Sequence, residues 1–102
     1  MNEQTLSWIF LSIAIASQKI PTSIAKISEA ADYINRSIPS YDELAHSISW
    51  LKQQNLISEV NNEFFLSELG KTIFEKSKNK KAILDIWKNL EKEFFDMKQN
   101  LA

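Results

Sequence analysis

Residues 40–70 read SYDELAHSISWLKQQNLISEVNNEFFLSELG, and this stretch decides the fold. Ser40 and Glu43 have the spacing of a capping box, in which each side chain accepts a hydrogen bond from the other residue's backbone N–H. The apolar residues that follow recur at i, i+4 and i+7, namely Leu44, Ile48 and Leu51. This pattern predicts a helix over residues 40–54 with one buried face.

A β-hairpin is predicted directly after this helix. Two short apolar runs, residues 56–60 and 63–67, flank Asn61-Asn62. Asparagine tolerates the positive φ that a two-residue type I′ turn requires at both central positions. A helix over residues 67–79 follows, and we expect Gly70 to serve close packing at its start rather than contact with a ligand.

The segments on either side of this centre are also helical in pattern. Residues 3–18 are apolar on nearly every side, which is typical of a helix buried on more than one face. Pro21 ends that helix, and Ser28 is the expected N-cap of a second helix over residues 28–36. A last helix over residues 81–98 carries an apolar seam of alternating 4,3 spacing, made of Ile83, Trp87, Leu90, Phe94, Met97 and Leu101. We therefore predict one domain over residues 1–102, mainly α with a small β-hairpin (α+β).

This order of elements resembles the winged helix-turn-helix domains of bacterial MarR- and PadR-type transcriptional regulators. The resemblance runs from Ile27 to Lys71 and is carried by three segments: IPSYDEL at 38–44, LKQQNLI at 51–57 and LSELGK at 66–71. Asn55 stands where these families usually have glycine. The resemblance implies a winged helix with extra N- and C-terminal helices, whose third helix enters the DNA major groove while the hairpin contacts the backbone or minor groove. The residues expected at DNA by position are Ser40, Tyr41, His46, Ser49, Gln53, Asn61 and Asn62, and Arg36 and Lys52 are the cations expected to supply phosphate contacts.

The charge distribution favours a different use of such a fold. Residues 1–70 contain four lysines and arginines against eight acids, whereas residues 71–102 contain eight lysines against five acids. DNA affinity depends on neutralising phosphates, and here the basic charge lies away from the expected reading helix. Two functions stay open: a DNA-binding transcriptional regulator, which the resemblance favours, and a protein–protein interaction module that does not bind DNA. In the second case Trp50 is a candidate anchor, although it could instead pack on the first helix or the hairpin.

The first and last helices together offer more apolar surface than a domain of this size usually buries. We therefore expect a homodimer that uses these two helices, although the same surface could pack within one chain. The residues proposed for this interface are Trp8, Leu11, Ile15, Ile83, Trp87, Leu90, Phe94 and Met97. A third function, small-molecule sensing between the same two helices, has only this apolar surface in its favour.

Several function classes are disfavoured by composition. The chain has no cysteine, one histidine and one glycine, so we expect no cofactor, no thiolate or histidine metal cage and no glycine-rich phosphate loop. No nucleophile and base occur at a catalytic spacing, so an enzyme is not expected, and His46 fits a solvated surface histidine. The apolar run at 6–16 follows MNEQT, which lacks the positive charge of a secretory signal, and the run is too short to cross a bilayer. We expect a cytoplasmic protein without a membrane partner.

Overall fold

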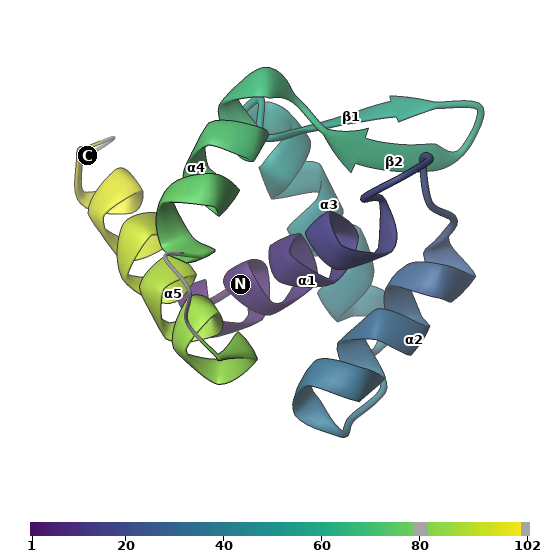
Figure 1. The fold of residues 1–102 in the computed structure, drawn as a ribbon, viewed down its shortest axis with the longest axis horizontal. Helices are drawn as coiled ribbons and strands as arrows, with labels where there is room; N and C mark the ends of the chain where they lie inside the picture. Colours follow the sequence, from purple (N-terminus) through teal and green to yellow (C-terminus); the bar gives the residue numbers. More distant parts are fainter. Residues whose placement is uncertain (79–81, 101–102) are drawn as a thin grey trace.

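The computed structural model describes residues 1–78 and 82–100, where the chain is mainly helical with a two-stranded antiparallel hairpin, as predicted (Figure 1). The elements in chain order are α1 (Glu3–Ala16), α2 (Ile24–Asn35), α3 (Tyr41–Gln53), β1 (Ile57–Val60), β2 (Glu63–Leu66), α4 (Glu68–Lys78) and α5 (Ile83–Asn100). The α2–turn–α3 unit followed by the hairpin gives the order of a winged helix, with α1 and α5 as the additional terminal helices.

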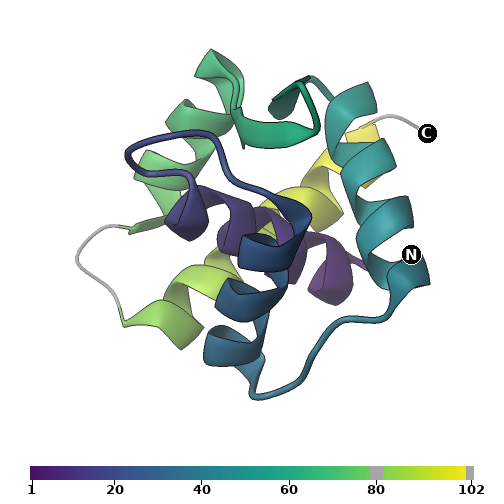
Figure 2. The same cartoon turned by 90° about the vertical axis from the view of Figure 1, so that its right-hand side faces the viewer.

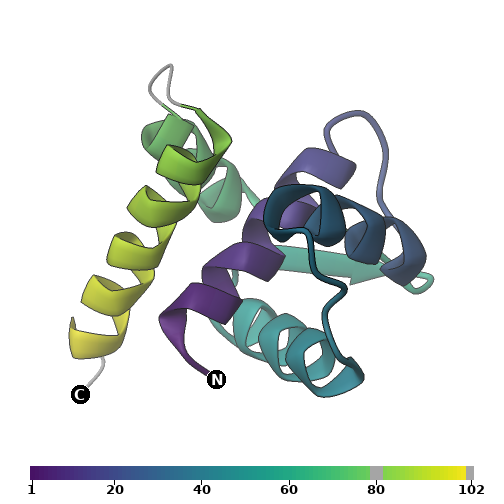
Figure 3. The same ribbon diagram turned by 90° about the horizontal axis from the view of Figure 1, so that it is seen from below.

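Helix α1 is the centre of the core. Figure 3 shows α5 on one side of α1, and α2 and α3 on the other. Every residue from Leu6 to Ala14 is buried, as its all-round apolar pattern predicted. The two serines in this stretch satisfy their hydroxyls within the helix: Ser7 Oγ donates to the Glu3 carbonyl at 2.7 Å, and Ser12 Oγ donates to the Trp8 carbonyl at 2.8 Å. Ser7 Oγ also accepts a hydrogen bond from Trp87 Nε1 at 3.1 Å, so this buried hydroxyl links α1 to α5.

The apolar seam of α5 packs on α1 in the same chain. Leu90 and Phe94 are fully buried, and the Phe94 ring meets Phe10 edge-on at a centroid distance of 5.4 Å. Trp87 lies 6.3 Å from Trp8 between ring centroids. Met97 is partly buried against the core, whereas Leu101, the last member of the predicted seam, lies outside the described residues.

The hairpin pairs in the predicted register around its two asparagines. Ile57 pairs with Leu66 at one end and Val60 with Glu63 at the other. Asn61 and Asn62 have φ values of 53° and 63°, which are the positive values expected for the turn. Asn55 also has a positive φ, 60°, so the position just after α3 requires a residue that accepts the left-handed region, as asparagine and glycine do.

A third segment joins the hairpin. Figure 2 shows the connection after α1 running up beside the hairpin before it turns into α2. Thr22 N–H donates to the Phe64 carbonyl, and Phe64 N–H donates to the Thr22 carbonyl, both at 2.8 Å. The sequence pattern did not predict this bridge, because a single paired residue leaves no alternation to detect.

The predicted start of the second helix is wrong. Helix α2 begins at Ile24, and Ser23 is its N-cap, accepting a hydrogen bond from Lys26 N–H at 3.3 Å. Ser28, the predicted cap, lies inside the helix. The apolar face in fact starts earlier, because Ile27, Ala31 and Ile34 repeat at i, i+4 and i+7 and all are buried.

The other boundaries differ by one or two residues. Helix α1 ends at Ala16 rather than 18, and α3, β1 and β2 are each shorter than predicted by one or two residues. Helix α5 extends to Asn100 rather than 98. The predicted end of α4 at 79 and the predicted start of α5 at 81 lie outside the described residues.

Gly70 has the packing role expected for it. A Cβ at this position would overlap the Leu56 carbonyl oxygen and lie 3.1 Å from the Leu56 carbonyl carbon. The first turn of α4 therefore lies directly on the backbone that leads into β1. Ser67 holds this junction, since its Oγ accepts from Gly70 N–H at 3.0 Å and donates to the Asn55 carbonyl at 2.6 Å.

Candidate functional site

The candidate site is the helix-turn-helix face, which consists of the end of α2, the turn, α3 and the hairpin. Helix α3 begins with the predicted capping box: Ser40 N–H donates to Glu43 Oε1 at 2.9 Å, and Glu43 N–H donates to Ser40 Oγ at 3.1 Å. Both backbone donors are thereby satisfied within the chain. The side chain of Ser40, a predicted DNA contact, thus serves as the helix cap. The Glu43 carboxylate lies beside the helix start, which is where a phosphate would otherwise bind.

The outer side of α3 presents a polar ridge, which we define as Asp42, His46, Ser49 and Gln53. Their 4,3,4 spacing puts them on one face of the helix, and all four are exposed. The structure therefore places His46, Ser49 and Gln53 together on one face, as the resemblance implied. The ridge contains one acid and no cation. On one flank His46, Ser49 and Gln53 border a hollow of about 320 Å³ that also reaches Met1 and Lys98.

Lys52 lies on the other flank of α3, where it binds the hairpin. Its Nζ is 2.7 Å from Glu59 Oε1 on β1. Lys52 is the one lysine or arginine between Tyr41 and Gln53, so the positive charge of α3 is paired with an acid of the same face. Asn61 and Asn62 are exposed at the hairpin tip, beside the exposed acid Glu63.

Three large apolar side chains are exposed at the corner between α2 and α3, one near the end of α2, one in the turn and one at the start of α3. We define the corner cluster as Tyr33, Ile38 and Tyr41, which are 78%, 73% and 83% exposed. Arg36 lies between them in sequence, is exposed, and ends α2 in the left-handed conformation with φ 53°. Pro39 is buried, whereas Ile38 before it points away from the core.

Sequence reasoning placed Tyr41 on this face but missed Tyr33 and Ile38. The available signal was that neither residue belongs to the apolar repeat of a helix. Tyr33 falls between the core positions Ala31 and Ile34, and Ile38 lies in the turn. Large apolar residues outside a core repeat are candidates for contact with a partner.

Trp50 packs on α5. Its ring lies 5.4 Å from the Phe94 ring between centroids, and Lys98 Nζ lies 5.9 Å from the Trp50 centroid. The Trp50 ring is thus partly buried by contacts within the chain, and these include the last helix. Contact of Trp50 with a partner protein stays a prediction.

The residues proposed for a homodimer interface lie in or against the core of the single chain. Trp8, Leu11, Leu90 and Phe94 are at most 4% exposed. The other four, Ile15, Ile83, Trp87 and Met97, are partly buried against the same core. A dimer through this set would require α1 and α5 to separate, so the intramolecular alternative accounts for the seam. The homodimer itself stays a prediction.

In residues 1–78 and 82–100, no group of three or more His, Asp or Glu side chains is placed to hold a metal ion. None of the helices described there is both long and apolar enough to cross a bilayer. Comparison with protein-family models, with curated proteins and with solved structures gives no significant match. The resemblance to MarR- and PadR-type regulators therefore stays a prediction.

Proposed function

We propose that this winged-helix domain binds another protein through the corner cluster and the adjoining α3 ridge. The observation that carries the proposal is the exposure of Tyr33, Ile38 and Tyr41 within nine consecutive residues. Exposed apolar patches of this kind mark interaction sites, and tyrosine is enriched among the residues that contribute most to binding.

The charges of the same face indicate the chemistry of the partner. Asp42, Glu43, Glu59 and Glu63 lie on α3 and the hairpin, and Lys52 is already paired with Glu59. A basic protein surface complements this face, because opposite potentials steer association and suppress wrong partners. A phosphate backbone would meet the exposed carboxylates of Asp42 and Glu63 there.

DNA binding is the second candidate function, and the polar ridge favours it. Gln53, Ser49 and His46 are exposed side chains of the kind that hydrogen-bond to base edges in a major groove. Arg36 would then supply a phosphate contact at the start of the reading unit. In that case Arg36→Ala lowers the salt slope of binding by about one unit.

Fluorescence anisotropy with random duplex DNA separates the two candidates. The purified protein is titrated into labelled DNA at low salt, and the salt concentration is then raised. We expect no binding at tens of micromolar protein. Micromolar binding that weakens steeply with salt would establish phosphate contacts and overturn the protein-only proposal.

The positive test is quantitative affinity capture of partner proteins. The tagged domain is incubated with the cytoplasmic fraction, the predicted location, of cells that contain the native protein. Wild type is compared with an Ile38→Ser, Tyr41→Ser double variant and with Leu84→Ser, which removes a side chain that is 55% exposed on α5. We expect one partner to be retained by wild type and Leu84→Ser and lost by the corner variant. Identical capture by all three proteins would contradict the assignment of the corner.

A further inference from the structure

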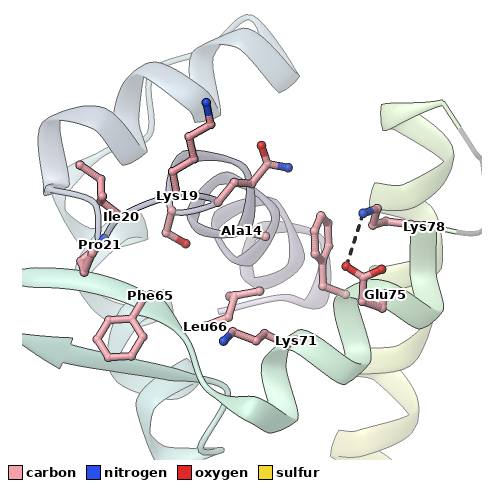
Figure 4. A pocket seen from close by; sticks show the side chains of 12 residues that line it. Ala14, Lys19, Ile20, Pro21, Phe65, Leu66, Lys71, Glu75 and Lys78 are labelled. Carbon is pink, nitrogen blue, oxygen red and sulfur yellow. Dashed lines mark hydrogen bonds and ion pairs between the residues drawn. The ribbon is translucent and has the colours of Figure 1, made fainter.

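A hollow of about 430 Å³ lies on another part of the molecule (Figure 4). Three segments that are distant in sequence form it: the end of α1 with the following connection, the end of β2, and α4. Its volume falls within the range of small-molecule sites, which are commonly concave and partly apolar. The hollow is separate from the face proposed above for protein binding.

The floor of this hollow is apolar. Ala14, Leu66 and Phe74 line it, and each is at most 7% exposed. Ile20 and Phe65 stand at its rim, where Ile20 is 63% exposed. An apolar group that enters the hollow would cover both the floor and these rim side chains, so the hydrophobic effect favours its entry.

The walls of the hollow are basic, in contrast to the acidic helix-turn-helix face. Lys19, Lys71 and Lys78 line it against one acid, Glu75. Figure 4 shows Lys71 beside Leu66, and Lys78 linked to Glu75. The Lys78–Glu75 pair is at 3.4 Å, and Lys71 pairs with Glu68 at the same distance. Solvent-exposed pairs of this length contribute little stability, so both ammonium groups can turn to another carboxylate.

We propose that this hollow binds a small amphipathic carboxylic acid. Its carboxylate would contact Lys71, and its hydrocarbon part would lie on Leu66 and Phe74. A purely inorganic anion would leave the apolar floor uncovered, and a neutral hydrocarbon would gain nothing from the lysines. The combination of an apolar floor and basic walls therefore selects a ligand that has both parts.

The test uses 4-phenylbutyrate as the probe, with isothermal titration calorimetry and amide chemical shifts as readouts. We expect a dissociation constant between about 10 μM and 1 mM, as for an open site and a small ligand. The largest shifts should fall at Ala14, Leu66 and Phe74. The matching alcohol, 4-phenyl-1-butanol, keeps the hydrocarbon part and removes the charge, so it should bind more weakly.

Two lysines of α4 provide a matched pair of variants. Lys71→Gln should weaken binding roughly fivefold, which is the upper end for an exposed charge pair. Lys76→Gln, on the same helix, should leave binding unchanged because Lys76 pairs with Glu93 on α5 and does not line this hollow. Thermal denaturation of both variants confirms that they are folded.

Three results would overturn the proposal. The first is the absence of heat and of amide shifts at millimolar probe. The second is equal affinity for the alcohol, which would mean that the lysines take no part. The third is equal weakening by the two lysine variants, which would indicate general charge attraction rather than this site.

Discussion

The sharpest test of the packing concerns Gly70. Substitution by alanine adds one methyl group where the structure leaves no space for it, because the methyl carbon would overlap the Leu56 carbonyl oxygen. That carbonyl cannot turn away freely, since it accepts a hydrogen bond from Ser67 N–H at 3.1 Å. The backbone conformation itself gives no reason for glycine, because Gly70 does not have a positive φ.

Two opposing effects set the magnitude for Gly70→Ala. Alanine is the better helix former by about 1 kcal/mol. Overpacking a close contact costs typically about 1–3 kcal/mol, occasionally more, and a rigid backbone neighbour puts this site at the upper end. We therefore expect a net loss of about 2 kcal/mol in the free energy of unfolding. For a domain of this size the midpoint of thermal unfolding should fall by roughly 8–16 °C.

Circular dichroism during thermal and urea denaturation measures both quantities. Thr72→Ala is the matched control, because it changes an exposed residue of the same helix, and it should alter the stability by no more than about 0.5 kcal/mol. If Gly70→Ala is as stable as wild type, or more stable as helix propensity alone predicts, the close approach of α4 to Leu56 is refuted.

Three further predictions address other contacts. Trp8→Phe removes a buried hydrogen bond, since Trp8 Nε1 donates to the Ala31 carbonyl at 3.0 Å. The free energy of unfolding in urea should fall by about 1–3 kcal/mol, and an unchanged midpoint of urea unfolding would contradict the contact. Asn62→Val places a β-branched residue at a φ of 63° and should cost about 1 kcal/mol or more, whereas Asn62→Gly should cost nothing. The pKa of Glu3 lies below its ordinary value of 4.5, mainly because its own backbone N–H binds the carboxylate and secondarily because Lys98 is near. The contribution of Glu3 to stability is therefore complete above pH 4.5 and lost as the pH falls through the lowered pKa, so Glu3→Gln should flatten the decline of stability below pH 4.5. An identical pH profile of the two proteins would count against the lowered pKa of Glu3.

The sequence predicted those parts of the fold that depend on local repeats. The capping box at Ser40, the asparagine turn and the buried face of α3 all involve residues a few positions apart, so their geometry is set locally. The start of α2 was wrong because Ser28 matched an N-cap preference, while the apolar repeat from Ile27 showed that the helix had already begun. The bridge between Thr22 and Phe64 joins distant segments through backbone atoms, and no side-chain pattern reports it.

The candidate site could be predicted only in part for the same reason. The exposed positions of α3 follow from its core repeat, so His46, Ser49 and Gln53 were placed correctly on one face. The pairing of Lys52 with Glu59 depends on how the hairpin folds back against α3, which a charge count cannot reveal. The lysine-lined hollow brings together residues from α1, β2 and α4, so it exists only in the folded chain.

Helix α5 determines which surfaces of the domain are left for partners. Fully burying a leucine or a phenylalanine contributes about 1.5–3 kcal/mol, so Leu90 and Phe94 together contribute roughly 3–6 kcal/mol. Loss of contacts of this size would be large against the net value of about 5–15 kcal/mol that is typical of a small domain, because that net value is the small difference between large opposing terms, so α5 belongs to the cooperative core. The same helix covers one side of α1 and part of Trp50. The two surfaces for which we propose partners, the apolar corner between α2 and α3 and the basic hollow beside β2 and α4, are formed by residues of other elements than α5.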